Sequence, residues 1–171
     1  MRRPIVSLLL LLGMSLPATA GELREQVLEQ LSGMEDPPSV EALSALGEGV
    51  SEELLQIAQD NSLSRTRRGR AVHALGYFPS DAGRSLLVTT LDADDNYMAR
   101  KAVYALGNGW GEAALVDLSR ALAAEDARLR EAAARAMGSI GSAPVRQALN
   151  ERLAVETETT VRDAITAALA Q

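Results

Sequence analysis

The chain of 171 residues contains no cysteine, one histidine and few aromatic residues. The lack of cysteine excludes disulfide bonds and lipid attachment to a cysteine, and with one histidine it leaves a zinc site almost without ligands. Aromatic residues make up 3% of the chain, whereas alanine is abundant, and this balance favours closely packed helices over a β-sheet. Stability must therefore come from packing of small and aliphatic side chains.

The segment 1–20 has the three-part pattern of a secretory signal peptide. Arg2 and Arg3 precede the apolar run 5–14, and small residues occupy 18–20. The run is shorter than the roughly 20 residues that a membrane-spanning helix needs, although an uncleaved anchor is the alternative. We predict cleavage after Ala20 and a periplasmic or secreted protein, with no membrane contact after signal removal.

Acidic residues outnumber basic ones, giving a net charge of −6. Residues 1–20 hold two basic residues and no acidic one, so the remainder carries −8. A surface with this balance is a poor match for phosphate backbones and for anionic lipids. The composition therefore predicts a partner that is a protein or peptide, and no nucleic acid.

A short motif returns at a fixed interval. Ala-Leu-Gly stands at 74–76 and 105–107, and Ala-Met-Gly stands at 136–138, so the two intervals are equal. An interval of this size is typical of a repeat array in which each unit contacts mainly its neighbours.

Apolar residues recur at spacings of three and four, which predicts helices throughout. The predicted hairpins pair 51–60 with 65–75, 81–91 with 96–106, 112–123 with 127–137, and 143–154 with 159–170. Helices at 22–32 and 40–46 would form an N-terminal cap over 21–50, ahead of a repeat array over 51–171. The glycines predicted to end helices in a left-handed conformation are Gly47, Gly76, Gly107 and Gly138.

The stretch 129–138, Leu-Arg-Glu-Ala-Ala-Ala-Arg-Ala-Met-Gly, resembles the second helix of a HEAT repeat, and 161–169 is similar. The period near 30 resembles the short HEAT-like repeats first noted in phycobilin (PBS) lyases. The resemblance covers about residues 40–171. It implies an all-α fold, a right-handed α-solenoid of about five antiparallel helical hairpins, the first degenerate, with the second helices lining the concave surface.

Four arginines begin the second helices of the predicted hairpins: Arg68, Arg100, Arg130 and Arg162. They could form an anion-binding row, or a structural ladder that bonds to the inter-helix loops. HEAT-like repeats commonly use such a ladder, and we favour it. The predicted N-caps are Ser64, Asn96 and Asp126. Arg100 is out of step, because it lies seven residues before its glycine, whereas Arg68 and Arg130 lie eight before theirs.

The variable residue before each motif is the best functional clue. His73, Tyr104 and Arg135 recur at the motif interval, on the side of the helix away from the Ala/Leu face. With Arg100 in the adjacent column, they predict a binding surface for a protein or peptide. Trp110 would anchor a partner or plug the gap between hairpins. The plain alternative is exposed variety, with Arg135 in an ordinary ion pair.

Other motifs fail on their spacing. The acidic loop 92–96 invites calcium, but the EF-hand positions for Gly and Glu hold Tyr97 and Val103, so a solvated capping turn is expected. The segment 107–111 lacks the Lys and Ser/Thr of a phosphate loop and is expected to be an inter-repeat turn. No catalytic constellation, metal site or cofactor is predicted.

These patterns predict a non-catalytic scaffold or adaptor of the cell envelope that binds a protein or peptide on its concave face. The alternative, carried by the resemblance to the lyase repeats, is a lyase-like or chaperone-like factor for chromophore or cofactor attachment. A third possibility is a module that assembles with itself.

Overall fold

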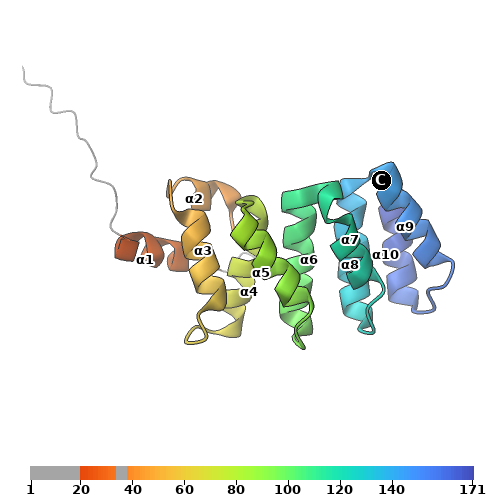
Figure 1. The fold of residues 1–171 in the computed structure, drawn as a ribbon, viewed down its shortest axis with the longest axis horizontal. Coiled ribbons are helices and arrows are strands. Elements are labelled where there is room, and N and C mark those ends of the chain that lie inside the picture. The colour runs from red at the N-terminus through yellow and green to blue at the C-terminus, as the bar shows by residue number, and fades with distance from the viewer. Residues whose placement is uncertain (1–19, 34–37) are drawn as a thin grey trace, which may run out of the picture.

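The computed structural model of the chain describes residues 20–33 and 38–171, and its regular structure there is entirely helical. Its helices form hairpins that lie side by side in chain order (Figure 1). The predicted all-α solenoid is therefore confirmed. No helix within these ranges is long and apolar enough to cross a membrane. The predicted signal peptide lies outside the described residues.

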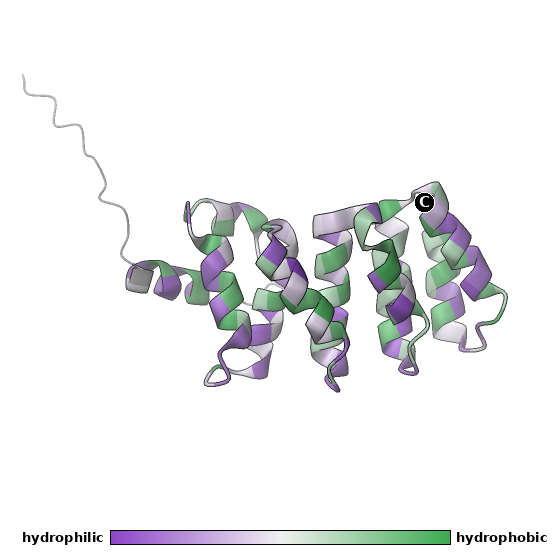
Figure 2. Cartoon of the chain, in the orientation of Figure 1, coloured by the Kyte–Doolittle hydropathy of each residue, from purple (hydrophilic) through white to green (hydrophobic). Residues whose placement is uncertain are grey.

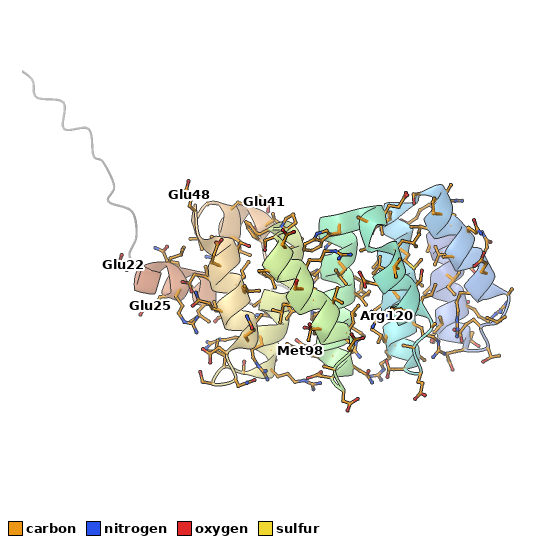
Figure 3. All side chains as sticks on the ribbon, in the orientation of Figure 1. Glu22, Glu25, Glu41, Glu48, Met98 and Arg120 are labelled. Carbon is orange, nitrogen blue, oxygen red and sulfur yellow. The ribbon has the colours of Figure 1, made fainter. Side chains whose placement is uncertain are left out.

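Two helices precede the regular array. Helix α1 (Ala20–Gln30) buries Val27, and α2 (Val40–Ser44) buries Leu43. The hydroxyl of Ser39 accepts a hydrogen bond from the backbone N–H of Ala42 at 3.2 Å and so starts α2. The solvent side of this end is acidic, with exposed Glu22, Glu25, Glu41 and Glu48 (Figure 3).

Within residues 50–169, four hairpins follow, at bounds that agree with the predicted ones to about one helical turn. Their first helices are α3 (Val50–Gln59), α5 (Asp81–Leu91), α7 (Leu115–Leu122) and α9 (Ala143–Leu153). Their second helices are α4 (Arg65–Ala74), α6 (Asn96–Trp110), α8 (Ala127–Ile140) and α10 (Thr159–Leu169). Two short 3-10 helices, η1 (Leu75–Tyr77) and η2 (Gly111–Ala114), follow α4 and precede α7.

Short polar side chains cap the starts of the second helices α4, α6 and α8. The Ser64 hydroxyl accepts from the N–H of Arg67 at 3.3 Å, and Asp126 accepts from Leu129 at 2.7 Å, as predicted. The prediction of Asn96 is wrong by one residue, because the carboxylate of Asp95 caps α6 instead. A carboxylate at this position also complements the positive end of the helix dipole.

The core lies between the first and second helices. Figure 2 shows hydrophobic and hydrophilic residues alternating around the helices of the array. The first helices bury large aliphatic side chains, among them Leu54, Leu87, Leu118 and Leu149. The second helices bury mainly alanine, including Ala71, Ala74, Ala102, Ala105, Ala132, Ala133 and Ala136. Because alanine is small, successive second helices pack closely side by side.

The predicted role of three motif glycines is wrong. Gly107 and Gly138 lie inside α6 and α8, and Gly76 lies in η1, so none of them ends its helix in a left-handed conformation. Gly47 does adopt that conformation (φ 88°), as predicted, and Gly141 (φ 63°) ends α8.

The motif glycines instead permit close approach of the next second helix. A Cβ on Gly76 would lie 2.6 Å from the Cα of Ala105, which is the alanine of the next motif. A Cβ on Gly107 would lie 3.2 Å from the Cβ of Ala136, the alanine of the motif after that. The glycine of each unit thus receives the alanine of its neighbour, which explains why the motif recurs as a whole.

Candidate functional site

The exposed side of the second helices carries most of the predicted site residues. Because α4, α6 and α8 pack side by side, residues that recur at the motif interval lie in line across them. We call this surface the second-helix face and define it by Arg70, Arg100, Lys101, Tyr104, Arg128, Glu131 and Arg135, all half-buried or exposed.

His73 and Tyr104 are brought together, as the interval predicts. Their rings stack with centroids 5.9 Å apart, and the centroid of the Tyr77 ring lies 5.8 Å from that of His73. His73 is only 8% exposed, so its place on an accessible column is a prediction that the structure corrects. The neighbouring aromatic rings cover it, and the accessible members of the column are Tyr104 and Arg135.

The hydroxyl of Tyr104 lies among charged groups. Burial raises the pKa of Tyr104, while the positive charges of Arg135 and Arg100 oppose that rise and Glu131 adds to it. The phenol is therefore protonated at neutral pH and can donate a hydrogen bond. Arg135 Nη2 lies 2.6 Å from Glu131 Oε1, the ion pair weighed as the plain alternative for this residue. A hydrogen-bond donor (Tyr104), a cation (Arg135) and an anion (Glu131) therefore lie close together on this surface.

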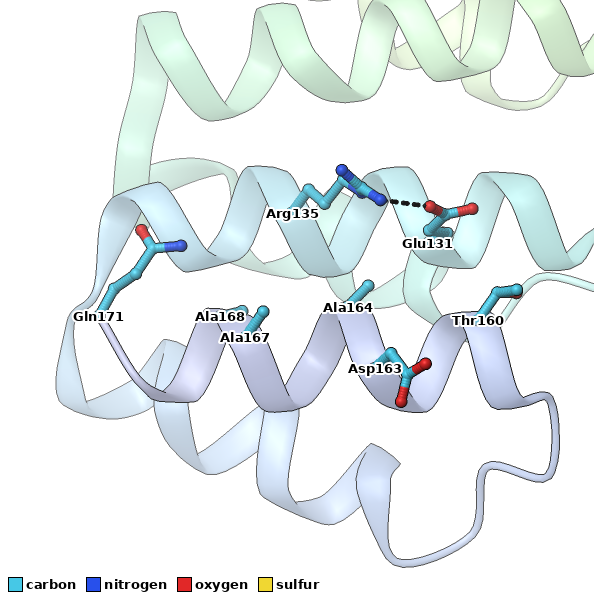
Figure 4. A pocket seen from close by; sticks show the side chains of 8 residues that line it. All are labelled: Glu131, Arg135, Thr160, Asp163, Ala164, Ala167, Ala168 and Gln171. Atoms are coloured by element: carbon cyan, nitrogen blue, oxygen red, sulfur yellow. Dashed lines mark hydrogen bonds and ion pairs between the residues drawn. The ribbon is translucent and has the colours of Figure 1, made fainter.

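A groove of about 480 Å³ extends from Glu131 and Arg135 toward the C-terminal hairpin (Figure 4). Glu131 and Arg135 of α8 form one wall, and α10 forms the other. The α10 residues that line it are Thr160, Asp163, Ala164, Ala167 and Ala168, and Gln171 follows the helix. The sequence interval extends the column to Ala167, or to Thr166 if the interval is kept strictly, but it did not predict the groove, because the alanines of α10 carry no sign of a site until the helices are placed side by side.

Arg130 has a structural role. Its Nε and Nη2 donate to the two carboxylate oxygens of Glu156 at 2.8 and 3.0 Å, and its Nη1 donates to the carbonyls of Ala124 and Glu125. Glu156 is 3% exposed and also accepts from Arg152 and from the backbone N–H groups of residues 157 and 158. The hydrogen bonds from Arg130 are the main reason why the pKa of Glu156 falls to about 2.

Two other predicted ladder arginines bond near their loops. Arg162 Nη1 donates to the carbonyls of Leu153 and Glu156 at 3.0 and 2.8 Å. Arg68 Nη1 donates to Asn61 Oδ1 at 2.7 Å. Each cation thus ties the start of a second helix to the loop before it.

Arg100 does not take part in this ladder, and its assignment there is wrong. The position equivalent to Arg68 and Arg130 is Ala99, which is buried. An offset of one residue turns a side chain by about 100° around a helix, so Arg100 points onto the second-helix face. Within the described residues it makes no hydrogen bond or ion pair, which leaves its guanidinium available to a partner.

Trp110 lies away from Tyr104 and Arg135. It is the last residue of α6, about 120° around the helix from Tyr104, and it is half-buried against the core. This position fits the plug between hairpins rather than a shared surface with Arg135. The segment expected to be a turn at 107–111 continues α6 up to Trp110, and the turn begins at Gly111, whose φ is 51°.

The acidic loop before α6 uses two of its carboxylates, those of Asp92 and Asp95, within the fold. Asp95 accepts from the N–H of Met98 at 3.0 Å and from Arg65 Nε at 3.0 Å, and Asp92 pairs with Arg120. The hydrogen bond from Arg65 holds the pKa of Asp95 below its ordinary value. No group of three or more potential metal ligands gathers anywhere in the described parts of the chain.

The stacked hairpins and closely packed second helices define a helical-repeat protein, an α-solenoid. A family model described as HEAT repeats matches residues 85–170, half of the chain, and the chain belongs to this family. HEAT repeats generally act as protein-interaction scaffolds. A crystal structure of an engineered protein is similar in fold, with a TM-score of 0.55 and 23% identity over 88% of this chain and 71% of that one. No match is found among curated proteins.

Proposed function

We propose that this protein is a non-catalytic adaptor of the cell envelope that holds a protein or peptide on its second-helix face. The observation that carries the proposal is the patch of Arg100, Tyr104, Glu131 and Arg135, which opens into the groove between α8 and α10. Within the described residues the charged groups of Arg100, Glu131 and Arg135 make no hydrogen bond or ion pair to another helix, unlike those of Arg130 and Arg162 beside them. Repeat arrays present such extended surfaces for binding.

Site-specific photo-crosslinking tests the face. A photoreactive phenylalanine analogue at Arg135, whose side chain is 61% exposed, is expected to form a covalent adduct with an envelope protein in cells. The matched control places the analogue at Val116 of α7, which is 74% exposed on a first helix. We expect at least about a fivefold excess of adduct at Arg135, because a specific interface covers one patch of surface. Equal adducts at both positions, or none at Arg135, would contradict the proposal.

Export is the second part of the proposal, and the sequence of residues 1–20 supports it. Protein recovered from the envelope fraction is expected to begin at Gly21, since the small residues at 18–20 suit signal peptidase. Intact-mass measurement checks this directly. Replacing Ala20 by a bulky residue should leave the full-length chain at the membrane. A wild-type chain that keeps residues 1–20 in the cytosol would rule out export.

A further inference from the structure

Charge is unevenly divided between the two layers of helices. The second helices α4, α6, α8 and α10 hold ten basic residues and two acidic ones, in a chain whose net charge is −6. The first helices α3, α5, α7 and α9 hold four basic and five acidic residues. Positive charge therefore gathers on one side of an acidic solenoid.

Part of that charge is used inside the fold. Arg65 pairs with Asp95, Arg130 pairs with Glu156, and the guanidinium groups of Arg68, Arg70 and Arg162 bond to loops or to chain carbonyls. On the second-helix face, Arg100 and Arg128 have no hydrogen bond or ion pair from their side chains within the described residues. Arg135 is bound by Glu131 alone, one turn away on its own helix.

The chemistry of these cations selects their partner. Of the 17 basic residues, 16 are arginine, whose planar guanidinium binds a carboxylate through two parallel hydrogen bonds. The Tyr104 hydroxyl lies near the guanidinium groups of Arg100 and Arg135 and adds a neutral donor. We propose that the second-helix face binds an acidic segment of a protein, rich in Asp and Glu, through Arg100, Arg128 and Arg135. This inference rests on the proposed function and adds the chemistry of its partner.

The surroundings of the face favour a short acidic segment over a nucleic acid. Acidic loops border the starts of the second helices, at Asp92, Asp94 and Asp95, at Glu125 and Asp126, and at Glu156 and Glu158. These loops lie at the edge of the face where the second helices start, so a long polyanion that ran past that edge would meet the exposed carboxylates of Asp94, Glu125 and Glu158. Helices α4, α6 and α8, spaced about 8–10 Å apart, span roughly 20 Å. About six residues of an extended peptide cover that distance. A local run of carboxylates fits on the face without reaching that edge.

Fluorescence anisotropy with a labelled oligoglutamate, a little longer than that span, tests the inference on the chain without its signal peptide. Binding is expected to weaken at least about tenfold in Arg100→Gln/Arg135→Gln, since two charge-assisted contacts are lost. The matched control, Gln56→Glu/Val116→Glu, changes the net charge by the same −2 on the exposed surface of first helices and should alter binding less than about twofold. Thermal unfolding checks that both variants fold.

Three outcomes would overturn the inference: a neutral serine-glutamine peptide that binds as tightly, equal losses in the two double variants, or an oligothymidylate of the same length that binds more tightly than the oligoglutamate. The proposed function is tested separately, by the photo-crosslinking experiment. An adduct at Arg135 that maps to a segment without acidic residues would leave the adaptor standing and remove the acidic partner. Absence of any adduct at Arg135 would remove the adaptor itself.

Discussion

Glu156→Gln is expected to lower the free energy of unfolding by about 3 kcal/mol, because it removes the buried anion that compensates Arg130. The carboxylate is almost fully buried and accepts from Arg130, from Arg152 and from two backbone N–H groups. It thereby joins α8, α9 and α10 at one loop. For a chain of this size, the loss should lower the melting temperature by roughly 6–12 °C in a thermal scan.

Asp95→Asn supplies the matched control for Glu156→Gln. Asp95 also forms a two-pronged pair with an arginine, but the side chains of Arg65 and Asp95 are 56% and 33% exposed. Asparagine caps a helix as well as aspartate does, so the substitution removes mainly the ion pair. We expect a cost under about 1 kcal/mol. Equal losses in the free energy of unfolding in Glu156→Gln and Asp95→Asn would show that burial does not increase the contribution of Glu156.

The same carboxylate gives stability a defined dependence on pH. The pKa of Glu156 is about 2 in the folded protein, below its ordinary value of 4.5. Between those values the unfolded state binds more protons, so the contribution of Glu156 is complete above about pH 4.5 and is lost as the pH falls toward 2. The difference in stability between the wild type and Glu156→Gln should shrink over that interval.

Gly76→Ala is expected to destabilise the protein by about 2–3 kcal/mol, through overpacking between η1, which follows α4, and helix α6. The added Cβ would lie 2.6 Å from both the Cα and the carbonyl oxygen of Ala105. Those are backbone atoms of α6, so relief requires the two second helices to separate. Urea denaturation of the variant and the wild type measures the difference.

Gly107→Ala is the control within the same motif. Its Cβ would lie 3.2 Å from the Cβ of Ala136, a contact that a small shift can relieve. Alanine is also the better residue inside a helix by about 0.5–1 kcal/mol, so the net change should be close to zero. If Gly76→Ala and Gly107→Ala cost the same, the close approach at Ala105 is not what requires glycine.

Much of the fold could be predicted from periodicity, because each hairpin contacts mainly its neighbours and repeats the same apolar spacing. The alignment of His73 with Tyr104 in one column followed from the same interval. The lower exposure of His73 did not follow from the interval. It depends on Tyr77, which is not one of the recurring positions and whose ring lies beside His73. The role in chromophore handling stays a prediction that rests on resemblance alone.

The arginines show where spacing was insufficient. Arg100 and Arg130 both stand near the start of a second helix, yet Arg100 points onto the second-helix face and Arg130 is tied to the loop of the next hairpin. The offset of one residue was visible, but its consequence was not, because a turn of about 100° matters only relative to a neighbouring helix. The groove between α8 and α10 likewise exists only once two alanine-rich helices lie together.

The sequence by itself determined the class of protein, since repeated helical patterns bury their apolar faces in one way, by stacking. Tertiary structure decided what each repeated residue does. It assigned the motif glycine to close helix contact, Glu156 to a buried junction and Arg100 to the surface. The physical reason is that burial and charge pairing are set by atoms of the next repeat, which are far away along the chain.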